Sequence, residues 1–364
     1  MECEVTIGIP VYRAVDYIEE TIASALAQTY EGLEVLVVDD CGGDGSVELV
    51  ERQQKVHPRG YCLRILRNER NQGVGPTRNR IIDEARGRWL FFLDSDDTIV
   101  TDAIYTLHRE AVKTQAEVVY GSMERRLPGT TKPVASYRYP YRSFVGNDQL
   151  AAYVFAHHGQ FQSSVCNALY DVSFLRSSGV RFGDARFWED TTFTYSVVLV
   201  SKKAVLIPEM TYCYHQRAGS LSNYQERSQL PKQEVLSNVD TIDKMKLRYA
   251  HLTDKIFMGD YCYTIQSYSF YIVCYVLKHR RRISPKLTGA EMHSIMQFPV
   301  SLRTVCGLAH RRMACLLLWV LARLPVVLQI MVLTAVRNVL SIRGSFLASV
   351  RRPGKAVKDI RALK

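Results

Sequence analysis

The sequence has no closely spaced pair of cysteines, although it contains nine of them, an odd number scattered along 364 residues. Because this spacing fits neither a metal knuckle nor a redox motif, we interpret them as free thiols in a reducing compartment. The first residues also lack the basic start and long apolar stretch of a secretory signal. We therefore expect the main folded part of the chain to be cytoplasmic.

Internal repeats, low-complexity tracts and long uninterrupted apolar runs are missing as well. Apolar residues nevertheless make up 47% of the chain, which excludes a disordered or fibrous protein. A chain of this length can bury a sizeable core, and it predicts one full α/β domain plus an appended region.

Acidic residues are nearly absent from the C-terminal segment. Residues 278–364 hold 17 Lys and Arg against only Glu291 and Asp359, so this segment carries a charge of +15 and the first 277 residues a charge of −4. The total of +11 therefore describes the tail and not the whole molecule. Such a basic segment seeks an anionic partner, either nucleic acid or acidic lipid headgroups.

An apolar stretch within this tail, at 313–336, favours lipid over nucleic acid. A spanning helix needs about 20 apolar residues, which the stretch nearly supplies, but Arg323 followed closely by Pro325 argues against a simple span. Three interpretations stay open: an interfacial or re-entrant hairpin, which we favour, a true span, and helices of a core. We expect peripheral association with an anionic membrane surface on its cytoplasmic face, helped by the basic run at 280–282, and no nucleic acid as a partner.

Short β-rich runs alternate with helical patterns near the N-terminus, which is typical of βα units and a mostly parallel sheet. We expect strands at 5–9, 34–38, 63–66, 89–93 and 117–120, and helices at 14–28, 46–55, 75–85 and 101–113. Prolines, glycines and tyrosines at 127–146 predict a long inserted loop, of the kind that folds over an acceptor site.

Acidic side chains follow two of the expected strands. Asp39 and Asp40 come after one, and Asp94, Asp96 and Asp97 come after another. Ligands bind at the carboxyl ends of parallel strands. Carboxylates gathered there repel one another and lose hydration, so a cation is the natural compensation. Mg²⁺ or Mn²⁺ would bind one or two of them and complete its shell with water and substrate phosphates.

Three runs of the sequence resemble family 2 glycosyltransferases: VTIGIPVYRAVDYIEETIASALAQTYEGLEVLVVDDCGGDGS, NQGVGPTRNRII and WLFFLDSDD. The resemblance covers about residues 4–220. It implies the α/β GT-A fold, a Rossmann-like, mixed and mostly parallel central sheet flanked by helices, here followed by a helical, basic, apolar C-terminal region. It also implies inverting transfer of a sugar from a nucleotide diphosphate sugar, by default a UDP-sugar, to a hydroxyl of a glycan or lipid-linked acceptor in surface polysaccharide biosynthesis.

The resemblance assigns a nucleotide-sugar site to the first half of the chain. Pro10 and Tyr12 would pack on the base, and Asp40 would contact it, with Asp39 as the neighbour that could substitute. Arg78 would lie by the nucleotide, where its charge and the helix N-terminus favour anionic groups. On residue type alone, Tyr12 could equally be a core aromatic.

The Asp–Ser–Asp run would supply the ribose and metal contacts. Asp94 and Asp96 would bind Mg²⁺ or Mn²⁺, with Asp97 as an alternate. The structural alternative is that Asp97 or Thr98 caps the helix that begins near 101. We favour metal binding because these acids follow the earlier acidic pair at the spacing of two further βα units.

The run FWEDTTFTY is similar to the family's Glu–Asp element, in which the aspartate is the general base. Here that residue is Asp190, which would draw the proton from the acceptor hydroxyl. A carboxylate is sufficient because an oxocarbenium-like transition state acidifies that hydroxyl. Alternatively, Glu189 and Asp190 are first-turn acids that favour a helix dipole, and Trp188 fits an acceptor pocket and ordinary packing equally well.

The run YCYHQRAGSLS is similar to the segment that closes over the diphosphate in this family. His215 and Arg217 would assist the leaving group, although both could be surface residues beside a strand. The chain departs from the family at Arg13, where asparagine is common. It departs again at Cys41, where Cys–Gly–Gly replaces Gly–Ser–Thr.

Two other functions fit parts of these observations. A sugar nucleotidyltransferase would also use aspartate-bound metal on an α/β sheet, but the glycine-rich, Lys- and Arg-bearing loop after the first strand is missing. A non-catalytic basic membrane or nucleic-acid adaptor would not need acids at strand ends. We expect a catalytic domain at 1–225 (nucleotide-binding half about 1–125, acceptor half about 126–225), a helical extension at 226–279, and a basic, membrane-associating helical tail at 280–364.

Overall fold

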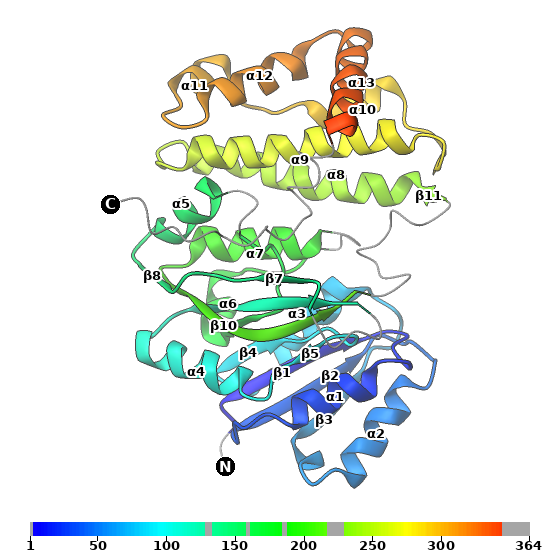
Figure 1. The fold of residues 1–364 in the computed structure, drawn as a ribbon, viewed down its shortest axis with the longest axis vertical. Coiled ribbons are helices and arrows are strands. Elements are labelled where there is room, and N and C mark those ends of the chain that lie inside the picture. Colours follow the sequence, from blue (N-terminus) through cyan, green and yellow to red (C-terminus); the bar gives the residue numbers. More distant parts are fainter. Residues whose placement is uncertain (1–2, 128–132, 158–160, 184–187, 217–228, 344–364) are drawn as a thin grey trace.

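The computed structural model describes residues 3–127, 133–157, 161–183, 188–216 and 229–343. A central sheet flanked by helices forms one end of the molecule, and layers of helices lie above it (Figure 1). The predicted site residue Arg217 and the predicted domain boundary at 225 lie outside the described residues.

The first four long strands form a parallel array. They are β1 (Val5–Val11), β2 (Leu33–Asp39), β3 (Leu63–Arg67) and β4 (Trp89–Phe92), in the order β3-β2-β1-β4. Helices α1 (Ile18–Leu26), α2 (Ser46–Val56) with the short η1 (Gly60–Cys62), and α3 (Val74–Glu84) make the crossovers. All of β1 and β4 is buried, as expected for strands that read as continuous apolar runs.

The sheet becomes mixed beyond β4. Its order continues β4-β9-β6-β10-β5, where β9 (Ala168–Asp171) is antiparallel to β4 and β6, while β6 (Val118–Arg126) and β10 (Lys203–His215) are parallel. The two-residue β5 (Thr98–Ile99) and helix α4 (Ala103–Thr114) precede β6. The predicted mixed, mostly parallel sheet and all five predicted strands are confirmed, and so are the four predicted helices.

The long loop expected at 127–146 is only partly correct. Its described residues contain β7 (Ala135–Tyr137), which pairs with β6, and β8 (Arg142–Val145), which pairs with β10. Pairing with distant strands satisfies backbone groups that local sequence reasoning left unassigned. Helices α5 (Gln149–Ala156), α6 (Val172–Ser178) and α7 (Glu189–Val200) complete this half.

The C-terminal part is helical, as predicted. Helices α8 (Lys232–Leu247) and α9 (Met258–His279), with η3 (Arg248–His251) between them, lie over the α/β part, and α10 (Gly289–Met296) to α13 (Val326–Arg343) lie above them (Figure 1). The short strands β11 (Leu230–Pro231) and β12 (Ile283–Ser284) pair beside α8. The phenol oxygens of Tyr195 and Tyr268 lie 3.0 Å apart and join α7 to α9. One continuous apolar core runs from β1 to α13.

The apolar stretch at 313–336 forms parts of two helices. Helix α12 (Arg312–Arg323) follows α11 (Leu302–Gly307) and ends just before Pro325, which directly precedes α13. Proline is well suited to a helix start because it lacks an N–H that would otherwise be unpaired there. Among the described residues, no helix combines the length and the apolar content that crossing a bilayer requires.

Candidate active site

Three neighbouring parallel strands place the predicted site residues at one edge of the sheet. Strand β1 lies between β2 and β4. Tyr12 follows β1, Asp40 follows β2 and Asp94 follows β4 within two residues of each strand end. The carboxyl ends of adjacent parallel strands face the same way, so the sheet brings these segments together.

Tyr12, directly after β1, is exposed to solvent. Its side chain is 44% exposed, and the Arg13 guanidinium lies 5.3 Å from the centre of its ring. Pro10, by contrast, is buried within β1 opposite Val38. Stacking on a base is therefore available to Tyr12, whereas Pro10 supports the turn from inside the sheet.

The two aspartates after β2 have different surroundings. Asp40 is buried, and its carboxylate accepts hydrogen bonds from Asn68 Nδ2 and from the backbone N–H groups of Gln72 and Gly73, each at 2.8 Å. Gly73 has φ of 93°, which a side chain would strain. Asp40 thus fixes the loop before α3, and its contact with a base stays a prediction. Asp39 is only half-buried and accepts from the Gly42 N–H at 3.1 Å.

Both departures from the family pattern lie in the left-handed region of backbone space. Arg13 has φ of 51° and Cys41 has φ of 60°. Asparagine and glycine, the residues that the family commonly has there, adopt this conformation at lower cost than other residues. Arg13 and Cys41 therefore adopt a backbone conformation that asparagine or glycine would adopt at lower cost.

Arg78 of α3 lies at the centre of a buried acidic cluster. Its Nη2 is 2.7 Å from Asp94 Oδ1, and its Nη1 is 2.5 Å from Asp190 Oδ1 and 3.0 Å from Glu189 Oε1. The Arg78 side chain is only 3% exposed, while that of Asp190 is 28% exposed. The guanidinium therefore faces protein carboxylates, and the predicted contact of Arg78 with the nucleotide stays a prediction.

Burial and charge pull on the ionisation of this cluster in opposite directions. Burial by itself lowers the pKa of Arg78, but Asp190 and Asp94 raise it well above its ordinary value, so the guanidinium stays charged. Burial raises the pKa of Asp190 in spite of the charge on Arg78. Burial and then the charge of Asp190 raise the pKa of Glu189 to about 8. One positive charge thus neutralises three carboxyl groups only in part.

A second set of contacts joins Asp97 to β10. Tyr212 Oη donates to Asp97 Oδ2 at 2.7 Å, and the His215 N–H donates to Asp97 Oδ1 at 2.8 Å. The His215 ring nitrogen Nε2 lies 2.9 Å from Thr98 Oγ1. The structure therefore brings His215 to the acidic end of β4, while Asp97, which is buried, acts as an anchor for β10 and not as a cap of α4.

Sequence reasoning gave little weight to Glu189 and none to Tyr212. Glu189 was visible as the neighbour of Asp190, but its partner Arg78 lies 111 positions away in the sequence. Tyr212 could be recognised only as the first tyrosine of the YCYH run, where no local pattern predicts its hydrogen bond to the Asp97 carboxylate.

The acids after β4 are side chains of the type that binds a divalent cation, although among the described residues no three His, Cys, Asp or Glu side chains are arranged as a complete metal cluster. Burial and then the charges of Asp96 and Asp94 raise the pKa of Asp97 well above its ordinary value. This repulsion marks a place where a further positive charge would be stabilised. Two carboxylates are enough for Mg²⁺ when phosphates and water complete the shell, and Asp94 and Asp96 could supply them.

The sequence matches known proteins in the same region. Residues 6–176 match the family model described as glycosyl transferase family 2. The succinoglycan biosynthesis protein ExoO of Rhizobium meliloti is 29% identical over 237 residues, which are 60% of this chain and 62% of that protein. The glycosyltransferase GlyA of Streptococcus pneumoniae is 24% identical over 240 residues, 60% of this chain and 31% of that protein. The alignments thus span less than two thirds of either relative.

The fold also matches solved structures over nearly its whole length. The S. aureus TarS 1–349 structure in complex with UDP-GlcNAc superposes with a TM-score of 0.64 at 17% identity, and covers 94% of this chain and 93% of that one. The predicted GT-A architecture with appended C-terminal helices is thereby confirmed. The family match assigns residues 6–176, which form most of the sheet, to glycosyl transferase family 2.

Proposed function

We propose that this protein is an inverting glycosyltransferase that moves a sugar from a nucleotide diphosphate sugar to an acceptor hydroxyl in surface polysaccharide biosynthesis. The observation that carries the proposal is the meeting of Asp94, Glu189 and Asp190 on the buried guanidinium of Arg78. Residues from the end of β4 and from the start of α7 thereby share one site. A non-catalytic adaptor would not need acids at the strand ends, and a nucleotidyltransferase would need the glycine-rich, Lys- and Arg-bearing loop that is missing after the first strand.

Asp190 is the general base in this proposal. Its carboxylate is oriented by Arg78 Nη1 at 2.5 Å and remains partly exposed, so an acceptor hydroxyl can approach it. Burial raises its pKa, and a base whose pKa is closer to the working pH transfers a proton more effectively. Asp190 takes the hydroxyl proton as the acceptor oxygen bonds to the anomeric carbon, and the diphosphate leaves from the opposite face.

Tyr12 and Asp39 at the ends of β1 and β2 would bind the nucleotide, and Asp94 and Asp96 would hold Mg²⁺ or Mn²⁺. The metal, when bound, supplies positive charge to the departing diphosphate. His215, whose Nε2 lies 2.9 Å from Thr98 Oγ1, would donate to the leaving group, and Arg217 is proposed for the same task. The likeness to the S. aureus TarS structure in complex with UDP-GlcNAc supports a UDP-sugar as donor.

A glycan or a lipid-linked precursor is the proposed acceptor. ExoO, by its name, acts in succinoglycan biosynthesis, which supports a polysaccharide product. The C-terminal helices support encounter with a membrane, because they leave apolar side chains uncovered. Met313 and Leu317 of α12 are 66% and 68% exposed, and Val327 and Met331 of α13 are 72% and 63% exposed.

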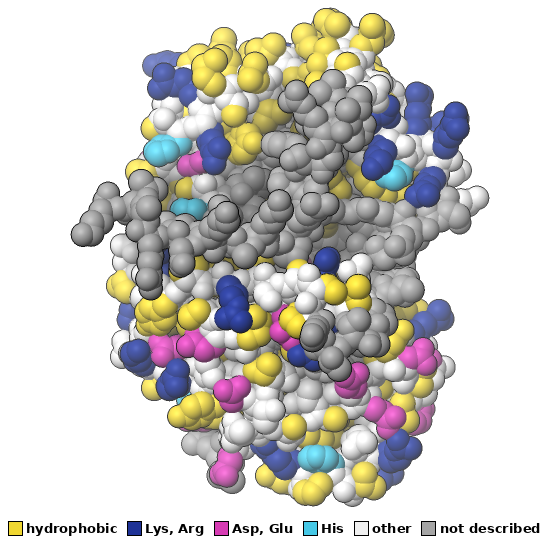
Figure 2. Space-filling view, in the orientation of Figure 1, with side chains coloured by type: hydrophobic (Ala, Val, Ile, Leu, Met, Phe, Trp, Pro, Cys, Tyr) yellow, Lys and Arg dark blue, Asp and Glu magenta, His cyan; other side chains and the backbone are white. Residues whose placement is uncertain are grey.

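Figure 2 shows apolar side chains gathered at the end of the molecule that carries α12 and α13, with Lys and Arg at its flanks. No acidic residue occurs between Glu291 and Asp359 in the sequence. We define this exposed set, Met313, Leu317, Val327 and Met331, as the C-terminal apolar face. An apolar surface surrounded by basic residues suits the cytoplasmic, anionic side of a bilayer, and we propose that it holds the enzyme there.

The test of the activity is release of nucleotide diphosphate from a panel of sugar nucleotides, measured with Mg²⁺, with Mn²⁺ and with chelator. We expect one donor to be turned over and binding of that donor to weaken when chelator is added. In Asp96→Ala we expect this metal-dependent part of donor binding to disappear, while Asp240→Ala on the exposed face of α8 behaves as wild type. Donor binding without any response to metal would remove Asp96 from the proposal, and no binding by any donor would remove the proposal.

A further inference from the structure

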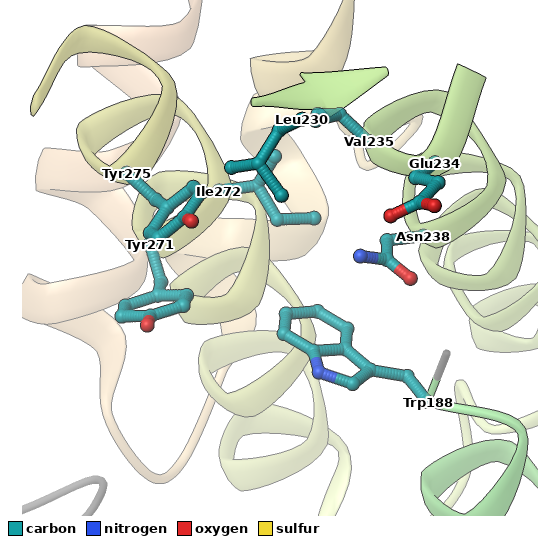
Figure 3. Close-up of a pocket in the computed structure, with 8 residues that line it drawn as sticks. All are labelled: Trp188, Leu230, Glu234, Val235, Asn238, Tyr271, Ile272 and Tyr275. Atoms are coloured by element: carbon teal, nitrogen blue, oxygen red, sulfur yellow. The ribbon is translucent and has the colours of Figure 1, made fainter. Parts of the chain in front are cut away.

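A pocket lies between the start of α7 and the helices α8 and α9 (Figure 3). Its empty space is about 420 Å³, which includes space open to solvent at its mouth. The residues that line it are Trp188, Leu230, Glu234, Val235, Asn238, Tyr271, Ile272 and Tyr275. The proposed transfer mechanism assigns no role to this pocket.

Two pairs of side chains face each other across this pocket. Glu234 and Asn238 lie one turn apart on α8, and Tyr271 and Tyr275 lie one turn apart on α9, so each pair shares a helix face. Figure 3 shows the carboxyl and amide groups on one side, the two phenol rings on the other, and the indole of Trp188 at one end. The pocket therefore offers aromatic surface opposite hydrogen-bonding groups.

The amide of Asn238 points to a missing partner. Its Oδ1 is buried and accepts no hydrogen bond from any of the described residues. A buried polar atom without a partner costs about 1–3 kcal/mol, and a hydroxyl donor from a ligand would satisfy it. The lining contains a carboxyl group and no Lys or Arg, so an uncharged ligand suits this pocket better than a phosphate.

The pocket is also connected to the proposed base. Trp188 directly precedes Glu189 and Asp190, and its backbone has φ of 62°. This conformation is unfavourable for a bulky residue and persists only where the surroundings impose it. The rings of Tyr268 and Tyr271 lie 5.3 and 6.3 Å from the Trp188 ring. A ligand that contacts Trp188 would therefore reach the residue next to the acidic pair.

We propose that this pocket is an acceptor subsite that binds an uncharged sugar unit of the acceptor glycan. The C–H groups of a pyranose ring carry partial positive charge and pack on the negative faces of the aromatic rings, while its hydroxyls donate to Asn238 and Glu234. This inference rests on the proposed transferase function and adds the place where the acceptor is held and the uncharged character of the sugar unit bound there.

Direct binding of simple glycosides tests the inference. The methyl glycosides of glucose, galactose, mannose and N-acetylglucosamine are titrated into the full chain, with tryptophan fluorescence as the readout and glycerol 3-phosphate as the charged comparison. We expect at least one neutral glycoside to bind with a dissociation constant near the millimolar range and glycerol 3-phosphate not to bind. Replacing Trp188 with Phe should remove the fluorescence change and so identify its source.

The variants Asn238→Leu and Glu234→Gln should weaken this binding at least tenfold, while Gln233→Ala, which changes an exposed amide on the same helix, should leave it unchanged. Thermal unfolding shows whether Asn238→Leu is folded. If that variant is unfolded, Glu234→Gln, which keeps the shape of the side chain, provides the test of binding. Binding of a UDP-sugar with metal is measured on the same samples. If the donor binds but no glycoside does, or if glycoside binding survives both variants, the subsite inference is overturned and the transferase proposal stands. If no sugar nucleotide binds, the transferase proposal fails instead.

Discussion

Arg78 Nη1 lies 2.5 Å from Asp190 Oδ1, although the two residues are 112 positions apart in the sequence. Arg78 belongs to α3 beside the parallel strands, and Asp190 belongs to the first turn of α7. Because Asp94 binds the same guanidinium at 2.7 Å, this one side chain fixes the acidic end of β4 relative to α7. The stability of the cluster and the orientation of the proposed base therefore depend on the same residue.

Arg78→Met should destabilise the protein by about 3–5 kcal/mol, because three carboxyl groups would lose their buried counter-charge. Arg78→Lys should lose less, since the charge remains but a single ammonium cannot contact both sides of the cluster. Urea unfolding followed by circular dichroism measures both. The control is Arg52→Met, which removes an exposed pair with Glu19 and should cost less than about 1 kcal/mol. An Arg78→Met variant as stable as this control would contradict the expected role.

Asp190→Asn should leave donor affinity nearly unchanged and lower turnover by about 10²–10⁴-fold, the usual contribution of a general base. Asparagine keeps the shape of the side chain but cannot accept the proton. Donor titration and acceptor-dependent transfer are measured on the same preparation, with Asp240→Asn on α8 as the matched control. Turnover at the wild-type rate would show that another group takes the proton.

The free energy of unfolding should fall as pH rises from about 5 to 8. Burial, together with the charge of Asp190, raises the pKa of Glu189 to about 8, above the value of about 4.3 expected in the unfolded chain. Between these values the folded state binds more protons than the unfolded state, so raising the pH favours unfolding. Glu189→Gln cannot lose a proton and should flatten this slope. The urea midpoints of wild type and Glu189→Gln are compared at pH 5.5 and pH 8. An equal change of the midpoint with pH in both proteins would contradict the raised pKa of Glu189.

Cys41→Gly and Arg13→Asn should each stabilise the fold, because both positions have positive φ. A left-handed conformation costs most L-residues about 1–2 kcal/mol, which glycine avoids. Part of that stabilisation is lost because glycine has greater conformational freedom in the unfolded chain. We expect a net gain of about 0.5–1 kcal/mol for Cys41→Gly. Thermal unfolding measures it, and Cys306→Gly, at another exposed cysteine, is the comparison. A loss of stability in Cys41→Gly would indicate that contacts of the Cys41 side chain stabilise the fold by more than the left-handed backbone conformation costs.

Leu317→Glu should release the protein from anionic liposomes by placing a negative charge in the C-terminal apolar face. Burial of one leucine side chain is worth about 1.5–3 kcal/mol, so we expect at least a tenfold weaker partition. Co-sedimentation with vesicles of phosphatidylcholine and phosphatidylglycerol measures it, and Val112→Glu, at an exposed position of α4, is the control. If wild type does not sediment but forms a dimer that Leu317→Glu dissociates, the face is an interface between copies of this chain and the membrane proposal is wrong.

Local sequence patterns predicted the parallel half of the sheet well. The runs that became β1, β2 and β4 are mainly apolar, and each is followed by polar residues, so both their type and their ends could be predicted. Strand β9 was missed because its four residues are paired on both sides with strands more than 40 positions away. Short strands β7 and β8 were assigned to a loop because prolines and glycines at 127–146 suggested no regular structure, and because both strands pair with segments that are distant in the sequence.

The sequence by itself determined that acids follow the strands of an α/β sheet, because apolar periodicity fixes where each strand ends and what comes next. It also determined that the basic charge lies in the tail. Only the tertiary structure decided which partners the acids have: Arg78 contacts Asp94 and Asp190, and Asp40 accepts hydrogen bonds from the loop before α3. The physical reason is that a charge is stabilised by the groups that lie within a few ångströms of it in space. Those distances are set by the packing of α7 and β10 near the end of β4, which no local sequence pattern predicts.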